Sequence, residues 1–383
     1  MIYDFDQIID RRSSDSIKWN LYGDAIPLWV ADMDFYSPEP VLRALTERVA
    51  HGLFGYGKEP PELRPVVVER LQRLYGWEVS PDALLFLPGI VSGFNQAARA
   101  VTYPGDGLLV QTPVYFPFFR VPQNAHLLMN EMELTLRDDG QYEVDFDLFE
   151  ETIAGRTRLF LLCNPHNPVG RVFARTELER MAEICLRHDV AICSDEIHCD
   201  LVFGGHQHIP IAALSPEIAR QTITLLAPSK TFNIAGIHAS VGIITDPKLR
   251  SRFEAARAGL VPHLGVLGYT AMLSAYRDGD DWLQQVLAYM QANRDYLYDY
   301  VDEYLPGITM EKPEGTYLAW LDCRGADLPE NAHKFFLEEA GVAMNDGATF
   351  GKGGEGFVRL NFACPRATLD QALEQMRQAL SRK

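Results

Sequence analysis

Six short apolar runs recur between about residue 80 and residue 245, and longer helical patterns separate several of them. The runs are Ala83–Leu87, Gly107–Gln111, Arg158–Cys163, Val190–Ser194, Thr222–Leu226 and Val241–Thr245. Each run is nearly continuous in apolar residues, as strands that are covered on both faces are. The sequence therefore predicts an α/β protein with a large domain built on a mostly parallel sheet.

A helix is predicted between the third and fourth runs. Thr176 is followed three residues later by Glu179, which is the pattern of an N-terminal capping box. Leu178, Met181 and Cys185 supply an apolar stripe for the same helix. Because a helix between two strands returns the chain to the same edge of the sheet, this unit favours parallel strands.

The two ends of the chain have a different pattern. The carboxyl part contains a strand-like segment, an acidic helix, a Gly-rich loop and a second strand, at Thr316–Leu321, 330–340, 347–356 and Phe357–Phe362. A length of 383 residues favours two domains over one. We predict a large domain over residues 41–281 and a smaller α+β domain from residues 1–40 and 282–383.

Charge and hydropathy exclude several classes of partner. The formal net charge is −17, and no run of Lys or Arg forms a track for nucleic acid. No stretch approaches the roughly 18 apolar residues of a membrane span, and Met1–Asp6 lacks the features of a signal peptide. The six cysteines lack CxxC spacing, so we expect no metal site. A cytoplasmic location, without membrane or nucleic-acid partners, is the expectation.

Candidate ligand-binding residues follow the apolar runs, because ligands of an open parallel sheet bind beyond the carboxyl ends of its strands. After the first run, Pro88–Gly93 leads into a helix whose free N–H groups suit a phosphate, although an ordinary strand-to-helix turn also explains it. After the second run, Tyr115 is placed either to stack on a planar ring or to pack in the core.

Asn167, Asp195 and Lys230 follow three further strands in order. Lys230 lies in a turn of small residues, which suits an amine nucleophile better than a solvated lysine. Asp195 is a carboxylate at an apolar strand end; either a protonated pyridine nitrogen or backbone N–H groups can satisfy it. Asn167 either donates to a phenolate oxygen or bonds within its own turn. Their order favours pyridoxal phosphate held by Lys230 as a Schiff base.

Several motifs add a family resemblance that spans nearly the whole chain. They are Trp29–Phe35, Gly55–Gly57, Asn164–Gly170, Ser194–His198, Ser229–Gly236 and Phe357–Asn361. The chain resembles fold-type I pyridoxal-phosphate enzymes of the class I/II aminotransferase superfamily. In the Trp29–Phe35 and Asp195–His198 runs it resembles the cystathionine β-lyase branch, also called carbon–sulfur lyases.

The resemblance implies a role for each matching residue. Lys230 is the Schiff-base lysine, Asp195 pairs with the pyridine nitrogen, and Asn167 bonds the ring oxygen. The remaining cofactor-binding residues are the stacking Tyr115, the phosphate-binding Ile90, Val91 and Ser229, and Tyr56 contributed by a partner subunit. Arg359 binds the substrate α-carboxylate, as its planar fork favours. A homodimer with shared active sites follows from the role of Tyr56.

Two positions depart from the common aminotransferase pattern. His198, which we count among the cofactor-binding residues, stands where a tyrosine is frequent. His238 stands where a phosphate-binding arginine is frequent; it either contributes a hydrogen-bond donor or packs, and we interpret it as a packing residue. Both departures agree with the lyase branch.

The predicted reaction is β-elimination from cystathionine or a related cysteine S-conjugate, which yields pyruvate, ammonia and a thiol. The same residues also serve an aminotransferase that acts on an amino acid and a keto acid. A third hypothesis is a regulatory protein that retains the cofactor. Arg366 lies near enough to Arg359 in the sequence to be considered for a second substrate carboxylate.

Overall fold

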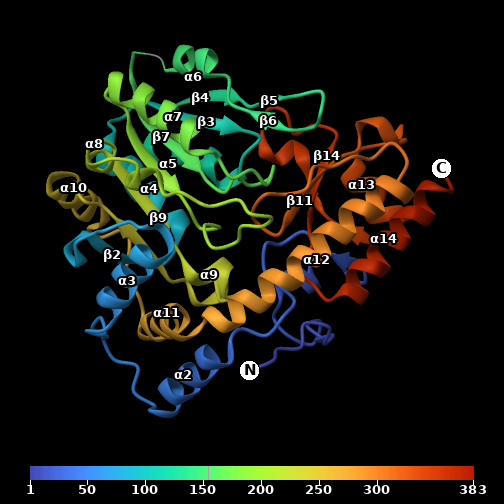
Figure 1. The fold of residues 1–383 in the computed structure, drawn as a ribbon, viewed down its shortest axis with the longest axis horizontal. Coiled ribbons are helices and arrows are strands. Elements are labelled where there is room, and N and C mark those ends of the chain that lie inside the picture. The colour runs from blue at the N-terminus through green and yellow to red at the C-terminus, as the bar shows by residue number, and fades with distance from the viewer. Residues whose placement is uncertain (154) are drawn as a thin grey trace.

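The computed structural model describes residues 1–153 and 155–383. Within these residues, a seven-stranded sheet has the order β2-β10-β9-β8-β7-β3-β4 (Figure 1). Its strands are β2 Leu84–Leu87, β3 Gly107–Thr112, β4 Leu128–Glu133, β7 Thr157–Cys163, β8 Ala191–Asp195, β9 Thr222–Leu226 and β10 Ser240–Ile243. β10 runs antiparallel to β2 and β9, and the other neighbours pair in parallel. The mostly parallel sheet predicted from the sequence is confirmed.

All six predicted strands are present; the bounds of Thr222–Leu226 are as predicted, and those of the other five differ by one or two residues. The prediction missed β4, which lies at one edge of the sheet beside β3. Its sequence, LMNEME, is polar at several positions, and only Met132 is buried. Unlike β2, the apolar strand at the other edge, β4 is mostly not buried, so the apolar pattern that identified the other strands was absent here.

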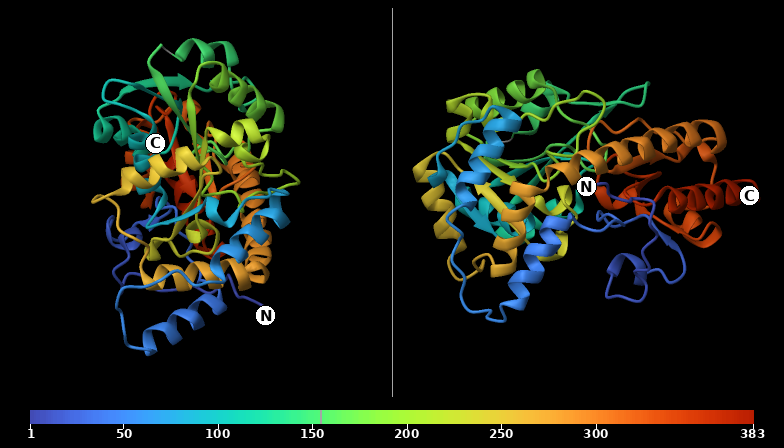
Figure 2. Two further views of the ribbon diagram at one scale, coloured as in Figure 1. Left: turned by 90° about the vertical axis from the view of Figure 1, so that its left-hand side faces the viewer. Right: turned by 60° about the horizontal axis from the view of Figure 1, so that its bottom comes forward.

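Helices cover both faces of the sheet (Figure 2). On one face, α4 (Ile90–Val101) packs in a cluster with Leu108 and Val110 of β3. On the other face, α7 (Arg175–Arg187) packs in a cluster with Leu109 of β3 and Phe160 of β7. Because successive residues of one strand are buried on opposite sides, the inner strands are apolar throughout.

The start of α7 differs from the predicted capping box. Ala174 is the residue before the helix, and its backbone N–H donates to Glu177 Oε2 at 2.8 Å. Thr176 already lies in the first turn, and Glu179 instead pairs with Arg175 at 3.5 Å. The prediction chose the wrong register, because Thr176 suggested a capping hydroxyl that this helix does not use.

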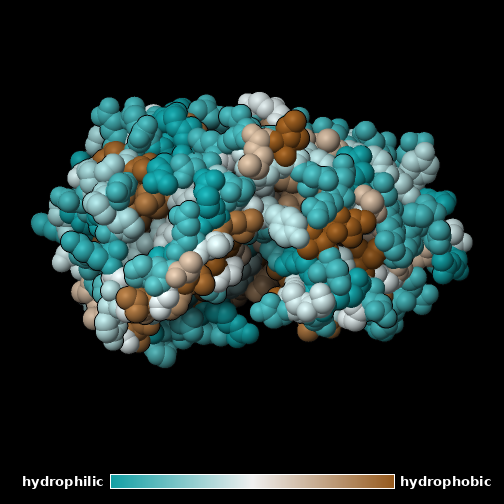
Figure 3. Space-filling view, turned by 90° about the horizontal axis from the view of Figure 1, so that it is seen from below, coloured by the Kyte–Doolittle hydropathy of each residue, from teal (hydrophilic) through white to brown (hydrophobic). Residues whose placement is uncertain are grey.

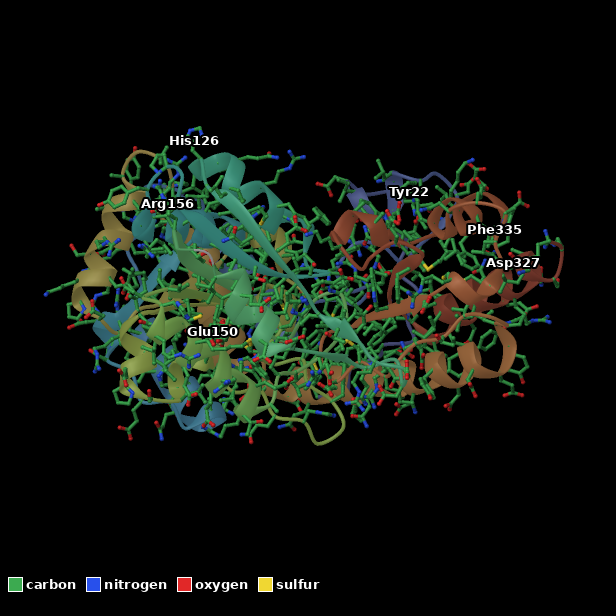
Figure 4. All side chains as sticks on the ribbon, turned by 90° about the horizontal axis from the view of Figure 1, so that it is seen from above. Tyr22, His126, Glu150, Arg156, Asp327 and Phe335 are labelled. Carbon is green, nitrogen blue, oxygen red and sulfur yellow. The ribbon has the colours of Figure 1, made fainter. Side chains whose placement is uncertain are left out.

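The second part of the molecule contains both ends of the chain. Its elements are β1 Ile26–Pro27, α12 Asp280–Tyr304, β11 Leu318–Asp322, α13 Ala332–Glu339, β12 Val342–Ala343, β13 Asn345–Asp346, β14 Phe357–Asn361 and α14 Arg366–Leu380. An antiparallel sheet has the order β11-β14-β13, and β1 pairs with β12. Figure 4 shows Tyr22 on the same side of the molecule as Phe335 and Asp327. The α+β part built from both chain ends is confirmed, while the boundaries after residues 40 and 281 stay a prediction.

Candidate active site

A cavity of about 610 Å³ lies where the turns after five strands of the large sheet face β14. Nine of the predicted site residues line it, namely Ile90, Val91, Tyr115, Asn167, Asp195, His198, Ser229, Lys230 and Arg359. Residues far apart in the sequence meet here because parallel strands end at one edge of the sheet. Arg359 reaches the same cavity from the opposite side, on β14.

Lys230 lies in α9 (Pro228–Thr231), four residues after the last residue of β9. Its Nζ donates a hydrogen bond of 2.6 Å to the carbonyl oxygen of Ala31. Burial lowers the pKa of Lys230 to about 8, and the nearby Arg359 acts in the same direction. Near neutral pH an appreciable fraction of this amine is therefore uncharged, as a nucleophile or base requires.

Asp195 is the last residue of β8, and its carboxylate is buried. Oδ1 accepts one hydrogen bond, from the backbone N–H of Ile197 at 3.2 Å. Burial raises the pKa of Asp195 to about 7. No Lys, Arg or His within the described ranges forms an ion pair with this carboxylate. A buried carboxylate of this kind suits a cationic partner such as a protonated ring nitrogen.

Arg359 is a buried cation whose hydrogen-bond partners are all neutral. Its guanidinium donates to Asn167 Oδ1 at 2.9 Å, to the Trp29 carbonyl oxygen at 2.9 Å and to Asn345 Oδ1 at 2.6 Å. Burial lowers the pKa of Arg359 to about 10. Because these contacts fix the planar group without neutralising it, the site attracts a carboxylate that enters the cavity.

The start of α4 supplies an anion-binding surface. Gly89, with φ of 144°, turns the chain from β2 into the helix, a conformation that other residues rarely adopt. The N–H groups of Ile90 and Val91 lie in the first turn, where helical N–H groups have no partner within the helix. With Ser229 on the same cavity wall, this helix end suits a phosphate.

These groups together fit pyridoxal phosphate. Asp195 forms no ion pair with any residue that the structure describes, the α4 start offers free N–H donors, and Lys230 supplies an amine in the same cavity. Tyr115 adds a half-buried aromatic ring to the same cavity wall. The Oδ1 atom of Asn167 accepts from Arg359, so its amide nitrogen is the atom left to donate to a ligand.

The two histidines of the cavity differ in their surroundings. His198 is buried, and burial, together with Lys230 and Arg359, holds its pKa well below the ordinary value. Its ring lies edge-on to that of Tyr317, with 5.9 Å between the ring centroids. His238 also lines the cavity, but its side chain is exposed. The interpretation of His238 as a packing residue is therefore wrong.

Two residues considered from the sequence lie outside this cavity. Tyr56 is fully exposed in the segment between α2 (Glu39–Ala50) and α3 (Leu63–Tyr75). Arg366 donates to Asn293 Oδ1 at 2.9 Å and lies over the ring of Tyr296. Since these contacts direct its guanidinium away from the cavity, the idea that Arg366 binds a substrate carboxylate is wrong.

The sequence did not reveal the residues that support Arg359 and Lys230. Asn345 is on β13, opposite Arg359 in the strand register, and only the folded sheet brings the two together. Tyr317 donates its hydroxyl to the Ala31 carbonyl oxygen at 2.9 Å, the same atom that Lys230 contacts. The Trp29–Phe35 motif was a visible signal for that backbone, but its use of carbonyl groups was not.

The described ranges contain no cluster of three or more His, Cys, Asp or Glu side chains arranged to hold a metal ion. Nor does any helix in this part of the chain have the length and apolar character needed to cross a membrane.

Comparisons with known proteins agree with this site. The sequence model of the family described as aminotransferase class I and II matches residues 24–376. Cystathionine beta-lyase PatB of Bacillus subtilis (strain 168) is 41% identical and aligns over 98% of this chain and 100% of its own length.

Two solved structures are similar over nearly all of both chains. OvoB is 44% identical, with a TM-score of 0.95 and 100% of both chains covered. The pyridoxal-phosphate-bound C-S lyase from Staphylococcus hominis is 35% identical, with a TM-score of 0.93 and 99% of both chains covered. The resemblance drawn from the sequence motifs is confirmed. The chain belongs to the aminotransferase class I and II family.

Proposed function

We propose that this chain is a pyridoxal-phosphate-dependent carbon–sulfur β-lyase that cleaves cystathionine or a related cysteine S-conjugate to pyruvate, ammonia and a thiol. The observation that carries the proposal is the meeting of Lys230, Asp195 and Arg359 in one cavity. The similarity to a cystathionine beta-lyase and to a C-S lyase supports the choice of reaction within the family.

Each end of the cofactor has candidate partners on this chain. Asp195 pairs with the ring nitrogen, Asn167 donates to the ring oxygen, and Tyr115 stacks on the ring. The phosphate is held by the N–H groups of Ile90 and Val91 and by Ser229, while the neutral His198 lies on the cavity wall. When bound, pyridoxal phosphate supplies an electron sink for negative charge that develops at the substrate Cα.

The protein residues bind the substrate and move its proton. Arg359 holds the α-carboxylate with two parallel N–H donors, which fixes the orientation of Cα. Lys230 Nζ accepts the Cα proton, because its lowered pKa leaves part of the amine uncharged near pH 7. The Lys230 ammonium then donates this proton to the sulfur that leaves from Cβ, so that the sulfur leaves as a thiol. A cationic ring nitrogen beside Asp195 would keep this carboxylate ionised, against the effect of burial on its pKa.

The test is to supply cystathionine without any keto acid and to measure pyruvate and free thiol. We expect both products from the wild-type protein, in equal amounts. Lys230→Ala removes the proton acceptor and should abolish release. If the wild type forms neither product, and an amine group is transferred only when a keto acid is added, the protein is an aminotransferase and the lyase proposal is wrong.

The proposal includes a homodimer in which Tyr56 reaches the cofactor phosphate of the partner subunit. Support comes from the full exposure of Tyr56 and from four partly exposed apolar side chains in the same stretch of the chain. They are Leu42, Val49, Leu53 and Phe54. Figure 3 shows the face seen from below, with apolar side chains, in brown, gathered in several patches. Such patches on a single chain are typical of surfaces that a second subunit covers.

A further inference from the structure

A buried polar network contacts Thr231, the residue after Lys230, and its members do not line the cavity. Its centre is Asp200, in the turn that follows β8, with a side chain that is 5% exposed. Asp200 Oδ2 accepts a hydrogen bond from the Thr231 hydroxyl at 3.0 Å. Its Oδ1 accepts one from the Tyr75 hydroxyl at 2.9 Å. The carboxylate therefore joins α9, which carries Thr231, to α3, which ends at Tyr75.

Arg70 holds this carboxylate in place. Its guanidinium pairs with Asp200 at 3.1 Å and with Asp280, the first residue of α12, at 2.7 Å. The rings of Phe232 and Tyr276 lie 5.6 and 5.2 Å from it. Arg70 is thus held by Asp280, Phe232 and Tyr276 as well as by Asp200. Asp200 is therefore a fixed acceptor for Thr231 and not a mobile surface carboxylate.

α9 is a four-residue helix, so its position depends on the contacts of its side chains. Adjacent residues of a helix point about 100° apart, and Lys230 faces the cavity while Thr231 contacts Asp200. Two residues later, Asn233 accepts from the Met33 N–H and donates to the Phe35 carbonyl oxygen. The backbone that bears Lys230 is thus held from two sides by hydrogen bonds.

We propose that Asp200, acting through the Thr231 hydroxyl, is a positioning residue that sets where the Lys230 amine lies in the cavity. This inference rests on the proposed role of Lys230 as cofactor-linked lysine and base. The action is geometric: Arg70 balances the charge of Asp200, and the carboxylate does not line the cavity. A small shift of α9 moves Nζ relative to the cofactor and to the substrate Cα.

The test compares two variants that each remove one hydroxyl from the same carboxylate. Thr231→Val removes the bond to α9, and Tyr75→Phe removes the matched bond to α3. We expect both to lower the thermal unfolding temperature by similar amounts. Only Thr231→Val should lower kcat on cystathionine, by about 10- to 100-fold with KM little changed, because the reacting amine is misplaced. Thr231→Ser keeps the hydroxyl and should restore kcat.

Two further readouts do not depend on turnover. In Thr231→Val, the visible circular dichroism of the bound cofactor should change, and the apoprotein should link added pyridoxal phosphate more slowly. Tyr75→Phe should match the wild type in both. Equal effects of the two variants on kcat, circular dichroism and linking rate, or wild-type values of these quantities for Thr231→Val, would overturn the positioning role.

Two safeguards keep the result interpretable. If Thr231→Val does not fold, Thr231→Ala provides the same comparison without the extra methyl group. If the wild type cleaves no cystathionine, the proposed reaction fails, but the circular dichroism and linking rates still decide the role of Asp200.

Discussion

The state of the Lys230 amine governs how readily the protein links its cofactor. Because burial lowers its pKa to about 8, the amine is mostly protonated at pH 7 and mostly uncharged at pH 9. Only the uncharged form attacks the cofactor aldehyde. We predict that the rate at which the apoprotein links pyridoxal phosphate rises with pH, with a midpoint near 8, as followed by the absorbance of the product.

Arg359→Gln is the matched control for this pH dependence. Arg359 helps to lower the pKa of Lys230, so its removal should shift the midpoint to higher pH. A midpoint near that of a solvated lysine, at about 10.4, in the wild type would contradict the prediction.

The neutral partners of Arg359 lead to a second prediction for a single residue. Asn167 accepts a hydrogen bond from Nη1 of Arg359, and Trp29 and Asn345 accept from Nη2; a lysine reproduces the charge but not this geometry. We expect Arg359→Lys to raise KM for cystathionine by about 10- to 100-fold, the cost of losing a charge-assisted pair. Cofactor absorbance should stay as in the wild type. An unchanged KM would show that Arg359 does not bind the substrate.

Among the elements, the strands with apolar runs could be predicted from the sequence, including the edge strand β2, whereas the polar edge strand β4 could not. Strands such as β7 and β8 are buried on both faces, so their apolar runs are unbroken, and Asn167 and Asp195 follow from their ends. β4 and β13 lack this signature because one is mostly not buried and the other is two residues long. Asn345 was missed for that reason.

The loop of residues 29–35 is held by asparagine side chains that the motif alone did not explain. Asn361 on β14 donates to the carbonyl oxygens of Val30 and Asp32 at 2.6 and 2.7 Å. We predict that Asn361→Ala lowers the free energy of unfolding by about 1–3 kcal/mol and also lowers kcat/KM, because Trp29 and Ala31 contact Arg359 and Lys230. Urea unfolding and steady-state kinetics measure the two effects.

Asn293→Ala is the control for that element. Asn293 is equally buried and also donates twice, to the carbonyl oxygens of Phe362 and Cys364. It should lose similar stability with kcat/KM close to that of the wild type. If both variants lower kcat/KM alike, the loop has no special link to the site.

At the scale of the whole molecule, each active site of the proposed dimer takes Lys230 from one subunit and Tyr56 from the other. The sequence motifs suggested this sharing, and it agrees with a chain in which Tyr56 is fully exposed and does not line its own cavity. Lys230→Ala therefore removes the contribution of one subunit to a site, and Tyr56→Ala removes the contribution of the other subunit to the same site. Neither variant alone can build an intact site in a symmetric dimer.

Mixing the two variants by co-expression distinguishes a shared site from a self-contained one. A hybrid dimer has one site with both substitutions and one site with neither, so half of its sites are intact. Since random pairing makes half of the dimers hybrids, we expect about one quarter of wild-type activity from the mixture. The two variants expressed separately should each be nearly inactive, and size measurements should give a dimer. If the mixture is no more active than the average of the separate variants, Tyr56 does not serve the partner's site.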